Sequence, residues 1–107
     1  MTQTTNAVSI ESREYWFKVV EFLQQNWSLV DLNDQGAVAW FVSDTSGVFD
    51  EIIFPSMEEA IRALIRNGFR RFSDDLKAQT MMRPPEAPFT RRTHPNGRIY
   101  SSGRFWK

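Results

Sequence analysis

The fold is decided by residues 54–72, which read F-P-S-M-E-E-A-I-R-A-L-I-R-N-G-F-R-R-F. Ser56 and Glu59 match the Ser-x-x-Glu capping box that marks the beginning of a helix. Asn67 and Gly68 favour the left-handed conformation that ends a helix. Between these two signals, apolar residues recur at the spacing of a helix with one buried face. We therefore predict a core helix here, with this buried stripe: Met57, Ala60, Ile61, Leu64 and Ile65.

Three segments before this helix have the composition of strands. Residues 28–32 end at the turn signal N-D-Q-G. Residues 37–42 (A-V-A-W-F-V) are apolar at every position, as in a central strand that is covered on both faces. Residues 48–54 follow a loop of hairpin length and are interrupted by two acidic residues. These segments predict a three-stranded antiparallel meander.

Residues 12–26 are predicted to form a first helix, because their apolar side chains follow helical spacing. Tyr15 and Phe22 lie on the flank of the apolar stripe, and Phe17 points away from it. The apolar surface is therefore wider than one packing face requires. Either the rest of the chain covers this excess surface, or the surface forms a patch for a partner. The stripe itself consists of Trp16, Val19, Val20, Leu23 and Trp27.

The order helix, three-stranded antiparallel meander, helix predicts a two-layer α+β domain over residues 9–72. Residues 69–72 (F-R-R-F) could add a short fourth strand, in which the arginines would discourage pairing with another sheet edge. Residues 1–8 carry no charged side chain and predict a flexible leader. Residues 73–107 predict an extended basic C-terminal tail.

The predicted tail combines proline with aromatic and basic residues. Residues 83–88 (R-P-P-E-A-P) predict a stiff extended spacer. The P-N-G turn at residues 95–97 predicts a small hairpin. Aromatic residues are scarce in disordered tails, so we expect Tyr100, Phe105 and Trp106 to dock on the domain itself or on a partner.

The formal net charge of zero conceals a strong asymmetry along the chain. Residues 1–61 carry two basic and ten acidic side chains, which gives 2 − 10 = −8. Residues 62–107 carry eleven basic and three acidic side chains, which gives 11 − 3 = +8. Two interpretations remain open. The two halves attract each other, within one chain or between copies, or the basic half binds an anionic partner.

The composition argues against several kinds of site. The chain of 107 residues has no cysteine, which excludes thiolate catalysis and cysteine-ligated zinc. Its single histidine, His94, cannot supply the three or four ligands that zinc needs. No phosphate-binding glycine loop or complete catalytic constellation occurs. No apolar run approaches the ~20 residues that cross a membrane. The sequence thus predicts a soluble, cytoplasmic, non-enzymatic protein without metal or cofactor.

Aromatic and arginine side chains dominate many protein interfaces. They lead us to predict an interaction module that binds another protein or a second copy of itself, as a homodimer. The alternative is a nucleic-acid-binding protein, whose tail supplies phosphate contacts and stacking platforms. The candidate binding residues for these functions are Tyr15, Phe22, Arg91, Arg92, Arg98, Tyr100, Arg104, Phe105 and Trp106.

Overall fold

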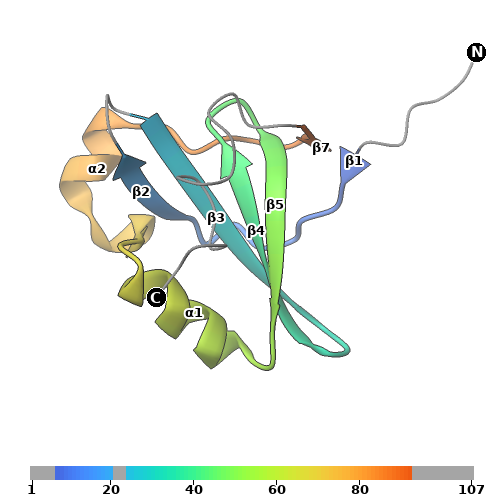
Figure 1. Ribbon diagram of the computed structural model, residues 1–107. Helices are drawn as coiled ribbons and strands as arrows, with labels where there is room; N and C mark the ends of the chain where they lie inside the picture. Colours follow the sequence, from blue (N-terminus) through green and yellow to red (C-terminus); the bar gives the residue numbers. More distant parts are fainter. Residues whose placement is uncertain (1–6, 21–23, 93–107) are drawn as a thin grey trace, which may run out of the picture.

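The described chain forms a seven-stranded mixed sheet with short helices packed on its two faces (Figure 1). The computed structural model describes residues 7–20 and 24–92. Across the sheet the strand order is β1-β7-β5-β4-β3-β2-β6. Only β5 and β7 pair in parallel, and every other neighbouring pair in the described sheet is antiparallel. In chain order the elements are β1 (Ala7–Val8), β2 (Trp16–Val20), β3 (Gln24–Asn33), β4 (Gly36–Ser43), β5 (Gly47–Phe54), α1 (Met57–Arg66), β6 (Arg70–Arg71), the 3-10 turn η2 (Phe72–Asp74), α2 (Leu76–Met81) and β7 (Phe89–Arg91).

The centre of the sheet is an antiparallel meander of β2, β3, β4 and β5. The hairpin between β3 and β4 closes at the pair Asn33↔Gly36, where the sequence predicts a turn. Gly36 has a φ of +137°, and a Cβ atom there would lie 2.3 Å from the carbonyl oxygen of Phe54. Only glycine fits this close approach of two backbones.

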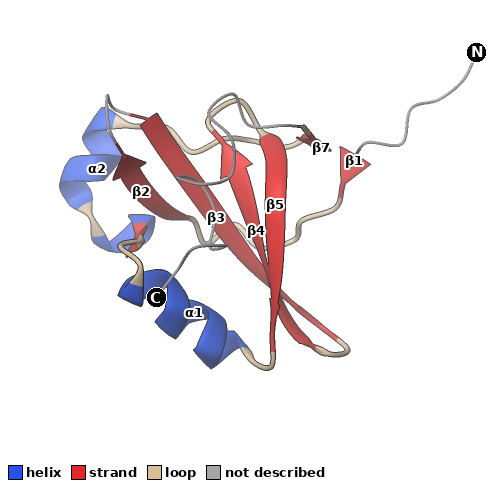
Figure 2. Cartoon of the chain, in the orientation of Figure 1, coloured by secondary structure: helices blue, strands red, loops and turns tan. Residues whose placement is uncertain are grey.

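Both faces of the sheet are buried, and each has its own hydrophobic core. Because successive strand residues point to opposite faces, the neighbours Trp16 and Phe17 belong to different cores, at 3% and 6% exposure. The α1-side core consists of Trp16, Val30, Ala37, Ala39, Phe41, Phe49, Ala60, Leu64 and Phe69. The α2-side core consists of Ile10, Phe17, Trp27, Leu29, Val42, Val48, Ala78 and Phe89. Figure 2 shows both helices packed beside the sheet.

The helix predicted over residues 56–67 is confirmed as α1. Ser56 caps it by accepting a hydrogen bond from the backbone N–H of Glu59 at 3.2 Å. Gly68, at a φ of +95°, follows its end. The predicted stripe is wrong at one position, because Ile65 is 58% exposed and Ala63 is buried instead. The buried face of α1 is therefore rotated from the predicted face, toward Ala63 and away from Ile65.

The predicted first helix over residues 12–26 is wrong, because this region forms β2 and the beginning of β3. A strand that is covered on both faces carries apolar residues at every position, so it also contains residues at helical spacing. Phe17, which the helical pattern directs away from the core, is buried against Trp27 with ring centroids 5.9 Å apart. The aromatic and β-branched residues of β2 fit a pleated surface better than a helix.

The predicted two-layer helix–meander–helix domain is therefore wrong as well. The meander gains β2 as a further strand, and β1, β6 and β7 widen the sheet to seven strands in the described part of the chain. β6 lies within residues 69–72, where a short edge strand was expected. β1 belongs to the segment predicted as a leader, and α2 and β7 to the segment predicted as a tail. Segments on both sides of residues 9–72 thus contribute to the sheet and its cover.

After α1, the chain crosses the α2 face of the sheet from one edge to the other. It leaves β6 through η2, where the N–H of Phe72 donates to the carbonyl of Tyr15 at 2.9 Å. It continues through α2 and the proline-containing segment and reaches β7 (Figure 1). There the N–H of Thr90 donates to the carbonyl of Ser46 at 3.1 Å, which joins β7 to the opposite half of the sheet.

Candidate functional site

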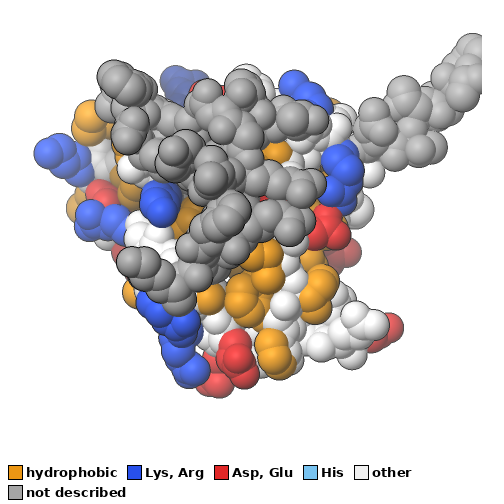
Figure 3. All heavy atoms as spheres, viewed as in Figure 1, with side chains coloured by type: hydrophobic (Ala, Val, Ile, Leu, Met, Phe, Trp, Pro, Cys, Tyr) orange, Lys and Arg blue, Asp and Glu red, His pale blue; other side chains and the backbone are white. Residues whose placement is uncertain are grey.

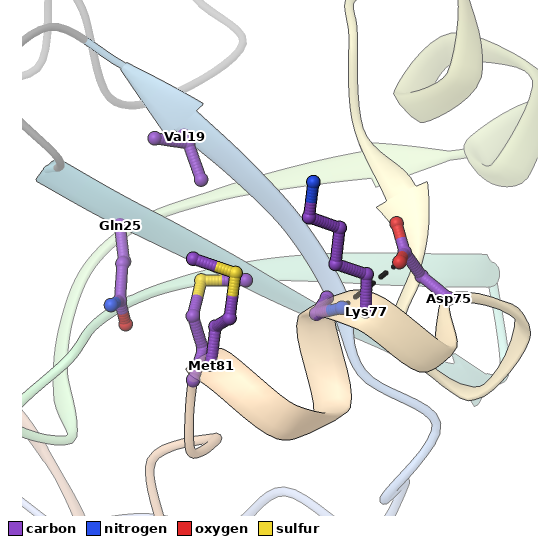
Figure 4. A pocket seen from close by; sticks show the side chains of 7 residues that line it. Val19, Gln25, Asp75, Lys77 and Met81 are labelled. Atoms are coloured by element: carbon purple, nitrogen blue, oxygen red, sulfur yellow. Dashed lines mark hydrogen bonds between the residues drawn. The ribbon is translucent and has the colours of Figure 1, made fainter.

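An apolar groove lies between α2 and the paired strands β2 and β3 (Figure 4). We call it the α2 groove. Its volume is about 340 Å³. Val19 and Gln25 border it from the strands, where they are directly paired. The helix side is lined by Asp75, Lys77, Ala78, Met81 and Met82.

An aromatic cluster next to the groove gives this region a rigid base. The rings of Phe17 and Phe72 meet edge to face with centroids 6.0 Å apart, and Trp27 lies 5.4 Å from Phe72. Tyr15 packs edge to face on Trp27 at 5.9 Å. Such pairs contribute about 0.5–1.5 kcal/mol each beyond the area that they bury. The helix that borders the groove therefore stands on a well-packed layer.

Several polar contacts fix the short α2 helix in its place. Asp75 caps it, accepting a hydrogen bond from the N–H of Ala78 at 3.0 Å (Figure 4). The other carboxylate oxygen of Asp75 forms an ion pair with Arg70 at 3.4 Å. The amide of Gln79 donates to the carbonyl of Phe72 at 2.9 Å. A helix of this length is not stable by itself, so these contacts and the burial of Ala78 hold it.

Large apolar side chains remain exposed around the groove. Val19 is 48% exposed and Met81 is 71% exposed, and both line the groove. Leu76, on the same short helix, is 77% exposed. Methionine is flexible and polarisable, which suits it to surfaces that adapt to a partner. The groove thus combines a rigid base with an adaptable apolar rim.

Basic side chains border the same region. Figure 3 shows lysine and arginine side chains along the flank of the molecule that carries α1 and α2. Among the described residues, neither Lys18 nor Lys77 has a carboxylate partner. The ammonium group of Lys18 lies 5.9 Å from the centre of the Phe69 ring. Arg70, by contrast, is neutralised by Asp75. Lys77 therefore brings a positive charge to the lining of the groove, and Lys18 brings one to the neighbouring edge of the sheet, on its α1 side.

Tyr15, one of the predicted binding residues, has a structural role in the fold. Its hydroxyl donates to the carbonyl of Pro85 at 2.7 Å, which ties the segment after α2 to the segment before β2. Burial raises the pKa of the Tyr15 phenol above its usual value of 10.0. The charge of Arg13 opposes this shift, and the charge of Glu86 adds to it.

Two predicted arginines, Arg91 and Arg92, have intramolecular partners at the end of β7. Arg91 forms an ion pair with Glu51 at 2.5 Å. Arg92 donates to the carbonyl of Thr45 at 2.5 Å and to the hydroxyl of Thr90 at 3.1 Å. Both therefore stabilise the junction of β5 and β7, which β4 separates from the strands β3 and β2 that border the α2 groove. Six further predicted residues lie outside the described residues: Phe22, Arg98, Tyr100, Arg104, Phe105 and Trp106.

Sequence reasoning did not select the residues that line the α2 groove. Val19 was assigned to the buried stripe of a helix, whereas its strand leaves it half exposed. The adjacent pair Met81 and Met82, after a cap at Asp75, was the signal that could have indicated an adaptable apolar site. Its position over β2 depends on the path of the chain across the sheet, which no local pattern encodes.

A second, more polar cavity of about 600 Å³ lies beside the β3–β4 hairpin. Asp31 lines it and accepts hydrogen bonds from the backbone N–H groups of Glu11 and Ser12, at 3.0 and 2.8 Å. The indole N–H of Trp40 also borders this cavity and has no hydrogen-bond partner among the described residues. The carboxylate of Asp31 thus holds the segment before β2 in place, and we assign this cavity a structural rather than a binding role.

Comparison with known proteins adds no assignment, because no family model, curated protein or solved structure matches the chain. In the described part of the chain, no three side chains of the metal-binding types are grouped so that they could hold an ion. None of its helices has the length and apolar character required to span a membrane.

Proposed function

We propose that the protein is a non-catalytic interaction module that binds another protein through the α2 groove. The observation that carries this proposal is the coincidence of exposed apolar side chains with a concave surface. Val19 and Met81 both border the groove and are about half exposed or more. Exposed apolar side chains scattered singly need no explanation, whereas apolar residues gathered around a hollow are typical of interaction sites.

The size of the groove limits what it can bind. At about 340 Å³ it accommodates one or two side chains of a partner. Burying an apolar side chain of this size contributes about 1.5–3 kcal/mol. Association itself costs about 4–15 kcal/mol, so a stable complex needs polar contacts beside the groove as well. The expected partner is therefore a segment of a protein that reaches beyond the groove.

A peptide-display selection tests this proposal without a known partner. Random peptides are selected for binding to the full chain, and the enriched peptides are synthesised and measured by fluorescence anisotropy. Met81→Glu places a charge in the apolar rim and should weaken binding about tenfold or more. Ile65→Glu is the matched control, because Ile65 is similarly exposed but lies on α1, which packs on the other face of the sheet.

Two outcomes would overturn the proposal. Either the selection enriches no peptide, or the enriched peptides bind Met81→Glu as tightly as the original protein. A homodimer, the other partner expected from the sequence, would appear as a concentration-dependent increase in mass in sedimentation experiments. We further propose, on the composition alone, that the protein acts in the cytoplasm.

Nucleic-acid binding remains the alternative proposal, but the described residues give it little support. Arg91 and Arg92 have intramolecular partners, and Arg98, Arg104 and Lys107 lie outside the described residues. An anisotropy titration with random DNA and RNA at two salt concentrations decides the matter. Phosphate binding requires an affinity that falls steeply with salt.

A further inference from the structure

At Val19 of β2, the backbone N–H and C=O groups point away from β3, toward the open edge of the sheet. In an antiparallel ladder, alternate residues of a strand direct both backbone groups to the same neighbour. The carbonyl of Tyr15 accepts from the N–H of Phe72 at 2.9 Å, so Tyr15 faces the β6 side. Phe17, two residues on, pairs with Arg70 of β6. Val19 follows by the same alternation and directs its N–H and C=O away from β3.

The pairing of β2 with β3, on the other side of the strand, leads to the same orientation of Val19. A two-residue hairpin closes on a hydrogen-bonded pair, here Asn33↔Gly36. Odd-numbered residues of β3 therefore bond to β4, and even-numbered residues bond to β2. Because Lys18 pairs with Asn26, the even-numbered residues of β2 face β3. Val19 must face outward.

No strand of the described chain covers this outward edge. β6 begins only at Arg70, opposite Phe17, so the backbone groups of Val19 have no ladder partner in the part of the chain that the structure describes. Val19 also lines the α2 groove. The open edge and the groove are thus parts of one continuous surface.

Side chains on the two sides of this edge define the chemistry of an added strand. Val19 lies on the α2 face with Phe17, whereas Lys18 lies on the α1 face with Trp16. A residue paired with Val19 would direct its side chain into the apolar groove. Its two sequence neighbours would direct theirs to the side of Lys18. Lys18 has no carboxylate partner among the described residues, which favours acidic neighbours.

We propose that β2 accepts an extended acidic segment of a partner protein as an additional antiparallel strand, hydrogen-bonded to Val19. An apolar side chain of that segment enters the α2 groove, and the carboxylates next to it in sequence pair with Lys18 on the α1 side of the edge. This mode is β-strand addition, in which backbone hydrogen bonds supply affinity and alternate side chains supply specificity. The inference rests on the proposed function and specifies the class of partner.

The charge of the chain's own C-terminus argues against it as the occupant. Residues 93–107 contain the basic residues Arg98, Arg104 and Lys107 and no aspartate or glutamate. Like charges beside Lys18 and Lys77 would repel such a segment. An acidic segment of another protein is favoured instead.

Synthetic peptides test the backbone contact directly. The probe is a short labelled peptide with one central leucine between two glutamates and with threonine elsewhere, and its control has lysine in place of glutamate. We expect the acidic peptide to bind the full chain at least about tenfold more tightly. N-methylation of the leucine should abolish binding, because this N–H faces β2, while N-methylation of an adjacent glutamate should have little effect.

Variants of the protein supply the reciprocal test. Val19→Pro removes the outward N–H but leaves the ladder to β3 intact, as proline permits at a sheet edge. Val19→Pro should weaken the binding of the acidic peptide about tenfold relative to Val19→Ala. Lys18→Glu should reverse the preference between the acidic and lysine peptides. If Val19→Pro fails to fold, the N-methylated peptides decide alone.

Several results would refute strand addition. They are equal binding of the acidic and lysine peptides, equal effects of the two N-methylations, or binding of a peptide of residues 93–107 as tight as that of the acidic peptide. Pairing of β2 edges between two copies would also refute it, and would appear as dimerisation lost in Val19→Pro. If display selection yields Met81-dependent peptides with a helical pattern, the proposed function stands and this inference fails.

Discussion

Replacing Phe17 with alanine distinguishes the two-faced strand β2 from the helix that its apolar spacing suggests. In the structure the Phe17 ring is 6% exposed and packs between Trp27 and Phe72, with centroids 5.9 and 6.0 Å away. In a helix over residues 12–26 the same side chain would lie away from the buried stripe. The two arrangements therefore give opposite expectations for one substitution.

The expected cost follows from the burial of the ring. Phenylalanine-to-alanine substitutions in well-packed cores cost about 3–5 kcal/mol. Small domains have a total stability of about 5–15 kcal/mol, so the variant should lose a large fraction of it. With a urea dependence of about 1–3 kcal/mol/M, the unfolding midpoint should fall by roughly 1–5 M. A side chain on the exposed face of a helix would cost about 0.5 kcal/mol or less.

Urea unfolding followed by tryptophan fluorescence measures this difference. Val19→Ala is the control, because Val19 lies on the same face of β2 but is 48% exposed. We expect a small change for Val19→Ala and a large one for Phe17→Ala. Phe17→Leu should fall between them and remains measurable if the alanine variant is mostly unfolded. Equal and small effects of both alanine substitutions would refute the assignment of β2 as a strand buried on both faces.

Three further predictions concern the turns, the partly buried phenol of Tyr15 and the groove. Gly36→Ala should destabilise the protein by at least about 1 kcal/mol, because the added Cβ would lie 2.3 Å from a backbone oxygen. Gly68→Ala should cost less, because no atom would lie within 3 Å of the Cβ added there. Thermal unfolding compares the two variants. Because burial raises the pKa of Tyr15, the folded state holds this proton more tightly than the unfolded chain. Its stabilising contribution should be complete below about pH 10 and lost as the pH rises through the folded pKa, and Tyr15→Phe should remove this component from an absorbance titration. Oxidation of Met81 and Met82 by peroxide should weaken the binding of peptides selected for the groove roughly ten- to hundredfold, an effect that the double variant Met81→Leu, Met82→Leu abolishes.

The elements that the sequence predicts correctly are those whose signals are local. Ser56 and the Asn67-Gly68 pair bracket α1 because capping and helix termination depend on a few adjacent residues. The turn before Gly36 is likewise a matter of neighbouring residues. The sequence also predicts β4 as a strand, because its apolar residues occupy both faces and the run is too short for a helix of usual length.

The elements that the sequence does not reveal depend on contacts between distant segments. β7 is three residues long and is a strand only because β5 and β1 lie beside it. α2 has six residues and is held by Asp75, Arg70 and the sheet beneath it. Neither segment is long enough for a periodic pattern. The candidate site shares this property, since its lining comes from β2, β3 and α2.

One feature of the chain path explains why the open edge and the α2 groove occur together. Phe69 is buried in the α1-side core, and Phe72, three residues later, packs against the α2-side core. The chain must therefore pass from one face of the sheet to the other within these residues, which leaves room for only two in β6. A strand that short cannot cover β2 as far as Val19. The same passage starts the segment that carries α2 across the sheet, so the edge left unpaired and the groove beside it arise from one constraint.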